Sequence, residues 1–177
     1  MISRVNAGPI DASHWIQDKD VGGGRIVGEG CHFIDFMQFI TGENPKQVFS
    51  VDVGNHDSGI TTDKAIICIR FADGSIGTLI YCGDGDKSLA KERFEVFGDG
   101  KSAVMDDFMR TDIYQGGRQN TFKTSRMDKG FSQEIGQFIS AISGQADPSL
   151  YVQARATTLS SILAVRSMTS GQCYTLD

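Results

Sequence analysis

A long central stretch of the sequence alternates apolar and polar residues and is interrupted by glycine-containing turns. Between residues 65 and 82 an apolar residue recurs at almost every second position, on both sides of Asp73-Gly74. The same pattern returns between 94 and 122, where the interruptions are Gly98-Asp99-Gly100 and Gly116-Gly117. Period-two alternation with tight glycine turns is typical of antiparallel strands joined by hairpins. This feature constrains the fold most, because it commits the middle of the chain to a meander of strands.

Other segments extend the sheet or form helices. Residues 2–6 and the valines between 48 and 53 have the composition of two further strands. Helical spacing of apolar residues marks three segments, which are 31–41, 131–142 and 152–169. Each spacing predicts an amphipathic helix with one stripe packed against a core. Because strands outnumber helices and do not alternate with them, the predicted fold class is α+β, an open, mostly antiparallel β-sheet with helices packed on one face.

Length and charge limit the classes of protein that fit. The 177 residues (19.2 kDa) fit a single domain, 1–177, which buries about 70% of the surface of the unfolded chain. With 17 basic and 22 acidic residues the net charge is −5, and no basic cluster is long enough to follow a nucleic acid backbone. No apolar run is long enough to span a membrane and no signal peptide opens the sequence, which predicts a cytoplasmic protein. The chain opens inside its first strand, at Ile2, so we expect it to be one domain of a larger protein.

The cysteines and histidines have no metal-site spacing. The four cysteines are Cys31, Cys68, Cys82 and Cys173. They are far apart and contain no C-x-x-C pair, so we interpret them as reduced, mostly buried thiols. The three histidines are His14, His32 and His56. Neither they nor a neighbouring cysteine show the spacing of a zinc ligand pair, and no metal is predicted.

A glycine-rich segment leads into the first predicted helix. Gly22-Gly23-Gly24 permits close approach of a ligand, but a G-x-G-x-x-G pattern needs glycine at Val27 and a P-loop needs lysine at Glu29, so a nucleotide-phosphate cradle does not fit. His32 follows in the first helical turn, and an imidazole is suited to proton transfer to or from an alcohol. The alternative is a histidine that only forms a structural hydrogen bond at a helix start. Asp35, three residues later, is expected to cap or orient rather than react.

Motifs spread over the chain resemble those of one family. Gly22-Gly23-Gly24, His32 and Asp35 are similar to the G-G-G…D-x-x-x-H-x-x-D signature of the Gfo/Idh/MocA oxidoreductases. Further segments recur in the family's order, namely Arg4-Val5-Asn6-Ala7-Gly8, Phe94-Glu95-Val96-Phe97-Gly98-Asp99-Gly100, Lys129-Gly130-Phe131 with Glu134 and Phe138, and Ser170-Gly171. The resemblance spans nearly the whole chain.

The resemblance implies a division of roles between two domains. Members of the family have an N-terminal Rossmann domain, which binds the dinucleotide and carries a catalytic lysine in an E-K-P motif. A second α/β domain binds the substrate and forms oligomers. This chain resembles the second domain alone, because it contains neither G-x-G-x-x-G nor E-K-P. We therefore expect NAD(P) to be held by a Rossmann domain outside these residues, with none bound by the chain itself, and the chain alone to be inactive.

The family's site residues match only some positions of this sequence. The resemblance implies that His32 is the general acid/base of an NAD(P)-dependent oxidoreductase acting on a secondary alcohol of a sugar or sugar nucleotide. By motif position, Asn6, Arg25 and Glu29 are candidate substrate contacts. Gly28 stands where the family has an aspartate, so either Glu29 substitutes for it or the histidine works without that neighbour. Gly28 also favours the alternative, a non-catalytic dimerisation or ligand-binding module that has lost the family chemistry.

The second face of the predicted sheet implies self-association. Helices cover only one face, so apolar residues that alternate onto the other face are expected to pair with a second copy. We expect a homodimer or a higher homo-oligomer formed through the sheet. The residues expected on this face are Val51, Val53, Ile67, Ile69, Thr78 and Ile80.

Overall fold

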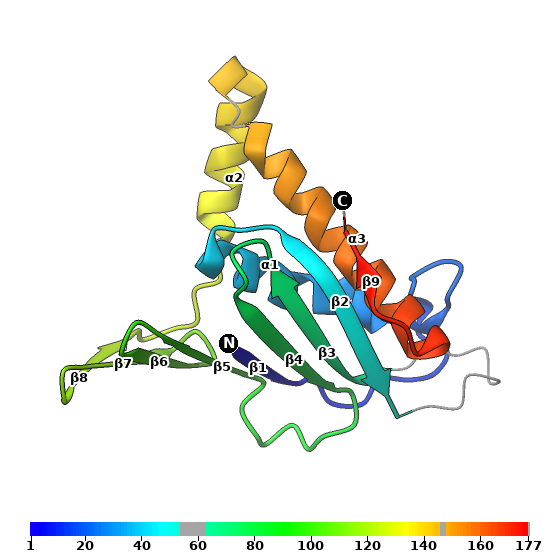
Figure 1. Cartoon of the computed structure of the whole chain (residues 1–177), viewed down its shortest axis with the longest axis horizontal. Coiled ribbons are helices and arrows are strands. Elements are labelled where there is room, and N and C mark those ends of the chain that lie inside the picture. Colours follow the sequence, from blue (N-terminus) through cyan, green and yellow to red (C-terminus); the bar gives the residue numbers. More distant parts are fainter. Residues whose placement is uncertain (54–62, 146–147, 177) are drawn as a thin grey trace.

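The computed structural model of the chain describes residues 1–53, 63–145 and 148–176. Its strands form a nine-stranded sheet in the order β8-β7-β6-β5-β1-β4-β3-β2-β9 (Figure 1). The strands are β1 (Ile2–Asn6), β2 (Pro45–Asp52), β3 (Lys64–Phe71), β4 (Ile76–Cys82), β5 (Glu92–Gly98), β6 (Lys101–Asp106), β7 (Arg110–Gln115), β8 (Arg118–Lys123) and β9 (Tyr174–Thr175). The helices are α1 (Cys31–Thr41), α2 (Phe131–Ser140) and α3 (Pro148–Ser170), with short helical turns η1 (Trp15–Gln17), η2 (Ile26–Gly30) and η4 (Ala141–Gln145). Among the described helices, none combines the length and the apolar character needed to cross a bilayer.

The predicted meander is confirmed with one difference. β1 is inserted between β4 and β5 and runs parallel to β4, whereas the other described strand pairs are antiparallel. The connection from β4 to β5 crosses the end of β1, where the Asn6 N–H donates to the Lys91 carbonyl (2.7 Å) and the Ala7 N–H donates to the Cys82 carbonyl (2.9 Å). The sheet is therefore mixed but mostly antiparallel.

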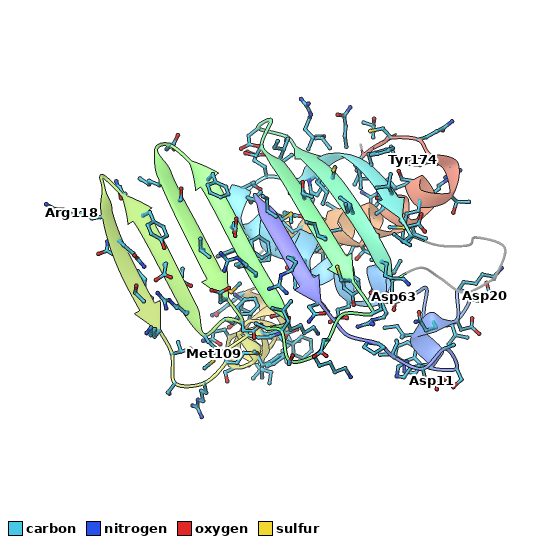
Figure 2. All side chains as sticks on the ribbon, turned by 90° about the horizontal axis from the view of Figure 1, so that it is seen from below. Asp11, Asp20, Asp63, Met109, Arg118 and Tyr174 are labelled. Atoms are coloured by element: carbon cyan, nitrogen blue, oxygen red, sulfur yellow. The ribbon has the colours of Figure 1, made fainter. Side chains whose placement is uncertain are left out.

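The helices pack on one face of the sheet, and the fold class α+β is confirmed. α1 and α3 lie over β2, β3 and β4 (Figure 1), while the opposite face is left open (Figure 2). Alternation along the strands turns one set of side chains toward the helices. Phe33 and Met37 of α1 are buried there with Val48, Ile67 and Leu79 from three neighbouring strands.

Two of the residues predicted for the open face lie on the other face. Val51, Thr78 and Ile80 lie on the open face as predicted, and Val53 follows the end of β2 with its side chain exposed. Ile67 and Ile69 are instead 0% and 2% exposed, because they face the helices. The register pairs them with Ser50 and Val48, both of which are buried under α3.

The glycine-rich segment is more structured than its sequence suggests. Helical conformation begins at Ile26, and η2 continues directly into α1, so His32 is not in the first helical turn. Gly22 packs against η1, where an added Cβ would lie 2.4 Å from the Ile16 Cα atom. The segment is therefore a tightly packed turn that needs glycine for close contact rather than a flexible loop.

The predicted apolar stripe of the third helix is confirmed only in part. Val152 is 52% exposed, whereas Leu159 and Leu163 are partly buried and pack against the core. The residues that α3 buries are Thr157, Ser160, Ser161, Ala164, Ser167 and Met168. Ser167 illustrates the reason, since its hydroxyl oxygen accepts the backbone N–H of Ser50 (2.9 Å) and so holds α3 close to β2.

The second helix contradicts the expectation that its apolar stripe packs on the core. All ten residues of α2 are exposed, and the helix rises away from the sheet (Figure 1). The expectation of mostly buried thiols is also wrong, because Cys68 and Cys173 are exposed and Cys31 and Cys82 are only partly buried. All four thiols are free. Periodicity predicted the elements correctly but not which surfaces cover their apolar faces.

Candidate active site

His32 lies on the exposed side of α1, near its start. Its side chain is exposed, whereas the adjacent Phe33 and Ile34 are buried. Within the described residues, no hydrogen bond or ion pair engages the imidazole ring. Glu29 precedes His32 by three residues and lies in η2, at the N-terminal edge of α1. His32 is therefore accessible, as predicted, and both ring nitrogens remain available to a ligand.

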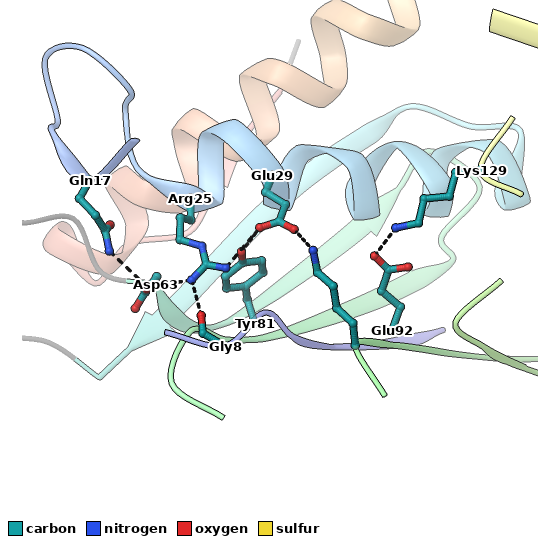
Figure 3. A network of polar contacts seen from close by, with 9 residues as sticks. Gly8, Gln17, Arg25, Glu29, Asp63, Tyr81, Glu92 and Lys129 are labelled. Carbon is teal, nitrogen blue, oxygen red and sulfur yellow. Dashed lines mark hydrogen bonds and ion pairs between the residues drawn. The ribbon is translucent and has the colours of Figure 1, made fainter. Parts of the chain in front are cut away.

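Glu29 is held at that edge by three side chains (Figure 3). The Tyr81 hydroxyl on β4 donates to Glu29 Oε2, and the Lys91 ammonium, just before β5, donates to Oε1. Arg25 Nη2 lies 3.5 Å from Oε2, one helical turn earlier. The carboxylate is thus fixed by donors from the helix, the central sheet and the loop between β4 and β5.

Arg25 connects this carboxylate to a second group of partners. Its side chain is buried, and Nη1 donates to the Gly8 carbonyl (2.8 Å) and to Asp63 Oδ2 (3.3 Å). Its guanidinium also lies over the Tyr81 ring, 5.4 Å from the centroid. Gln17 Nε2 reaches the same Asp63 oxygen at 3.4 Å. The network therefore joins the first loop, η2 and two central strands into one rigid support.

The environment fixes the ionisation of this network. Burial tends to raise the pKa of Glu29, but donation from Lys91 and Tyr81 and the nearby positive charges outweigh it, so the pKa is lowered. Burial and the Glu29 carboxylate raise the pKa of Tyr81, which keeps the phenol protonated. Burial also raises the pKa of the Cys31 thiol. At neutral pH the site therefore combines an ionised carboxylate with a neutral phenol donor.

A second ion pair lies beside the first. Lys129, directly before α2, donates to Glu92 Oε1 (2.7 Å) and lies over the Phe108 ring, 5.3 Å from its centroid (Figure 3). Glu92 is 3% exposed and its other oxygen, Oε2, is buried without a hydrogen-bond partner in the described structure. The Phe36 ring of α1 packs against Phe108, with centroids 5.7 Å apart. These contacts link the start of α2 to the edge of α1 that carries His32.

The other predicted residues lie apart from His32 or are already bonded to protein groups. Asn6 is buried, and its side-chain nitrogen donates to the carbonyls of Asp86 (2.6 Å) and Leu89 (3.2 Å). Asp35 Oδ1 lies 3.2 Å from the Thr157 hydroxyl, which connects α1 to α3. Direct substrate contacts of Asn6 and Arg25 stay predictions.

Gly28 packs closely against Ile16. A Cβ atom added there would lie 3.0 Å from Ile16 Cδ1, so the end of the Ile16 side chain would have to shift slightly to accommodate it. Among the metal candidates, His14 caps η1 by accepting the Ile16 N–H at 3.3 Å, and His56 lies outside the described residues. The described residues contain no group of three or more potential ligands that could hold a metal ion.

Sequence reasoning missed Tyr81 and Lys91. A tyrosine on the buried side of a central strand needs a polar partner for its hydroxyl, so Tyr81 carried a usable signal. Lys91 carried none, because its position depends on how the loop crosses β1. The candidate site was therefore recognised from its helix and not from the sheet residues that hold it in place.

Sequence comparison identifies the family. The model of the GFO/IDH/MocA C-terminal domain matches residues 2–104, more than half of the chain. The chain belongs to this family. The resemblance drawn from the motifs is therefore confirmed. No curated protein matches the chain in sequence.

Several solved structures share the fold. Levoglucosan dehydrogenase in complex with NADH matches with a TM-score of 0.78 at 19% identity, covering 99% of this chain and 57% of that one. UDP-N-acetylglucosamine 3-dehydrogenase GnnA from Acidithiobacillus ferrooxidans matches with a TM-score of 0.71 at 20% identity, covering 94% and 52%. GenD2 from gentamicin A biosynthesis, in complex with NAD, matches with a TM-score of 0.71 at 20% identity, covering 99% and 54%. The chain spans about half the length of these proteins.

The described residues do not fit a dinucleotide. A dinucleotide site needs a parallel strand, a glycine-rich turn and a helix in direct succession, so that backbone N–H groups face the pyrophosphate. The parallel pair here, β1 and β4, is not joined by such a unit. In this chain the glycine-rich turn precedes η2 and packs against η1 instead. The described residues therefore form no site for a dinucleotide.

Proposed function

We propose that the chain is the substrate-binding and oligomerisation domain, 1–177, of a cytosolic NAD(P)-dependent oxidoreductase. Its substrate is a secondary alcohol of a sugar or a sugar nucleotide. The supporting facts are the family membership, the fold shared with sugar and sugar-nucleotide dehydrogenases, and a chain that covers about half of each. The four free thiols are consistent with a reducing compartment.

His32 is the proposed general acid/base, and its exposure beside a fixed carboxylate is the observation that carries the proposal. A neutral imidazole at this position takes the proton of a substrate hydroxyl, or an imidazolium returns it to a carbonyl. Glu29, three residues earlier, is ionised at neutral pH, because hydrogen bonds from Lys91 and Tyr81 and the nearby positive charges outweigh burial and lower its pKa. Arg25 and Lys91 act as positioning residues, because both hold Glu29.

The dinucleotide belongs to a domain outside these residues. When bound, it accepts or donates the hydride, and the relatives crystallised with NADH or NAD are about twice as long as this chain. The chain's own residues bind the sugar, orient its hydroxyl at His32 and move the proton. In this proposal Asn6 holds the loop after β4 in place, and Glu29 lies closest to the substrate of the three predicted contacts.

Self-association through the open face of the sheet is the second part of the proposal. Ile2, Phe49, Val51, Ile66 and Ile76 lie on this face with exposed fractions between 38% and 65%. They come from four adjacent strands, β1, β4, β3 and β2, so the open face exposes apolar side chains across the width of four strands. Such a surface on a water-facing sheet is typical of an interface between copies.

A non-catalytic module is the alternative that one observation favours. At Gly28 the carboxylate of the family signature is missing, and the Ile16 side chain packs closely against this position. If the chemistry has been lost, His32 is an exposed residue without a role in turnover, although the sheet still forms the oligomer.

The substitution His32→Asn in the intact oxidoreductase distinguishes the two. We expect kcat to fall by about 10²- to 10⁴-fold, the usual contribution of a positioned proton-transfer group. The melting temperature should hardly change, because the ring is exposed and unbonded. His14→Asn is the matched control, since it keeps a good cap on η1 and lies away from α1. Equal rates for the two variants would support the non-catalytic module.

A further inference from the structure

Trp15 is an exposed aromatic residue in η1, on the loop that precedes η2. It is the only tryptophan in the sequence, and it is 60% exposed. A tryptophan side chain presents a large apolar area and is usually well buried in a folded protein. Exposed tryptophans are uncommon beyond what function needs, and loops on a rigid scaffold often carry binding residues. The exposure of Trp15 therefore indicates contact with a ligand.

The backbone around Trp15 is fixed by hydrogen bonds and by close packing. The Trp15 carbonyl accepts the Asp18 N–H (3.2 Å), and the Ile16 carbonyl accepts the Gly24 N–H (2.9 Å). A Cβ atom at Gly22 would lie 2.6 Å from the Trp15 carbonyl oxygen, so the glycine-rich turn packs directly against η1. A ring on such a fixed backbone loses little further freedom when a ligand binds, which favours binding. The loop therefore holds the attachment point of the indole ring in one place.

η1 packs against the helical segment that carries His32. Ile16 Cδ1 would lie 3.0 Å from a Cβ atom at Gly28, in the middle of η2. Gly28 precedes His32 by four residues, which corresponds to roughly 6 Å along a helix axis. η1 is thus anchored about one helical turn from the proposed acid/base.

The three side chains of η1 point in different directions. With three residues per turn, neighbouring side chains in a 3₁₀ turn are about 120° apart. Ile16 points to η2, whereas Gln17 is buried, with its Nε2 atom 3.4 Å from Asp63 Oδ2 (Figure 3). The remaining direction, that of Trp15, leads into solvent. The indole ring therefore lies at the rim of the network around Arg25, where it is open to a ligand.

We propose that Trp15 is the platform on which the ring of the substrate sugar stacks. This inference rests on the proposed function. The C–H groups on the face of a pyranose ring are apolar and slightly positive, so they pack on the negative face of an indole. The hydroxyl groups around the same ring need polar partners, which Glu29 and His32 provide. An aromatic surface beside a few fixed polar groups is the combination that a sugar requires.

Stacking on Trp15 acts on substrate binding and specificity and not on proton transfer. The platform selects which face of the sugar turns toward the protein, and a sugar with an axial hydroxyl on that face stacks poorly. In this proposal the His14 ring only caps η1, since its Nδ1 atom accepts the Ile16 N–H (3.3 Å). Trp15 is therefore a specificity-determining residue of the oxidoreductase.

Tryptophan fluorescence of the 177-residue chain tests the proposal. Because the sequence holds a single tryptophan, the emission reports on Trp15 alone. The probes are methyl β-D-glucopyranoside, methyl β-D-galactopyranoside and methyl α-D-mannopyranoside, each added to about 100 mM, so that a site with a Kd of about 10 mM is filled. We expect a saturable shift of the emission to shorter wavelength and less quenching by iodide, because stacking removes the ring from water. The glucoside, whose substituents are all equatorial, should bind most tightly.

Kinetics of the intact oxidoreductase give a second readout. Trp15→Ala should raise KM for the sugar about tenfold with kcat little changed, because the lost contact is made equally before and during the reaction. Trp15→Phe should restore most of the affinity, since it keeps an aromatic face. Val21→Ala is the matched control, because Val21 lies on the same loop and is 72% exposed. Equal KM values for Trp15→Ala and Val21→Ala would contradict the proposal.

Three fluorescence results would overturn the platform. In the first, none of the three glycosides changes the emission. In the second, uridine changes it and the glycosides do not, which would assign the ring to a nucleobase. In the third, the emission shifts with protein concentration in the absence of sugar, which would assign Trp15 to a contact between copies. The chain with His32→Asn should still show the sugar-induced shift, so loss of turnover in that variant bears on the proposed function and not on stacking.

Discussion

Glu29 is the residue through which the candidate site is joined to the core. Its carboxylate accepts hydrogen bonds from Tyr81 and Lys91 and pairs with Arg25. Such a carboxylate is costly to replace, because its buried donors lose their acceptor. The orientation of the exposed edge of α1 therefore depends on one ionised group.

We expect Glu29→Gln to destabilise the chain by about 1–3 kcal/mol at pH 7, because Arg25 and Lys91 lose the negative charge with which they pair. The folded-state pKa of Glu29 lies below its ordinary value of 4.5, so its contribution is complete above pH 4.5 and is lost as the pH falls through the folded-state pKa. The difference in unfolding free energy between wild type and variant should therefore shrink in acid. Urea unfolding of wild type and variant at pH 7 and at a pH below the folded-state pKa of Glu29 measures this difference, with exposed Glu43→Gln as the control variant. An equal difference at both pH values would contradict the assignment.

The sequence predicted one side of the site and missed the other. Spacing placed His32 on one edge of the predicted helix 31–41, whereas Arg25 and Glu29 were candidates by motif position only. Tyr81 and Lys91 reach that edge through strand pairing and a loop crossing, which no local pattern encodes. Gly28 was noticed as a missing carboxylate, but only the structure shows that Ile16 packs closely against this position.

At the scale of elements, η1 and the turn at Gly22 set the start of the long helix. Gly22→Ala should destabilise the chain by about 1–3 kcal/mol, because its Cβ would lie 2.4 Å from the Ile16 Cα atom and 2.6 Å from the Trp15 carbonyl oxygen. Gly98→Ala is the matched control, since nothing lies within 4 Å of a Cβ there. Thermal unfolding of the two variants gives the comparison. Equal melting temperatures would show that the turn relaxes without cost.

The open face of the sheet carries its own prediction. Ile66→Asp places a charge among exposed apolar residues of β2 and β4, where a second copy would have to desolvate it. We expect the variant to sediment as a monomer at concentrations at which the wild type is dimeric or larger. Ile135→Asp, on α2, should leave the sedimentation coefficient unchanged. A wild type that stays monomeric at high concentration would refute the interface.

Helical periodicity was sufficient to find all three helices but not to assign what they pack against. An amphipathic stripe indicates only that one side of a helix packs against another apolar surface. α1 finds its partner in the sheet, whereas α2 finds none in the described chain. The contact of α3 relies on serines, which sequence patterns count as polar. Ile67 and Ile69 were placed on the wrong face for the same reason, because alternation gives two faces without saying which is covered.

At the scale of the whole molecule, the hairpins and the glycine turns could be predicted, and the insertion of β1 could not. Hairpins are local, whereas β1 pairs with strands about 75 and 90 residues away in the chain. This long-range pairing brings Asn6 and Lys91 together at the end of the sheet. The result is a domain whose helix α1 carries the exposed His32 and whose described part presents no dinucleotide cradle.

Calorimetric titration of the 177-residue chain with NADH and NADPH tests this account most directly. The chain should show no saturable heat up to about 1 mM of either dinucleotide, because none of its described elements presents a pyrophosphate site. The protein made by joining a dinucleotide-binding half ahead of Met1 should bind in the same titration and serves as the control. Saturable binding of NADH to the chain alone at micromolar concentration would contradict the account.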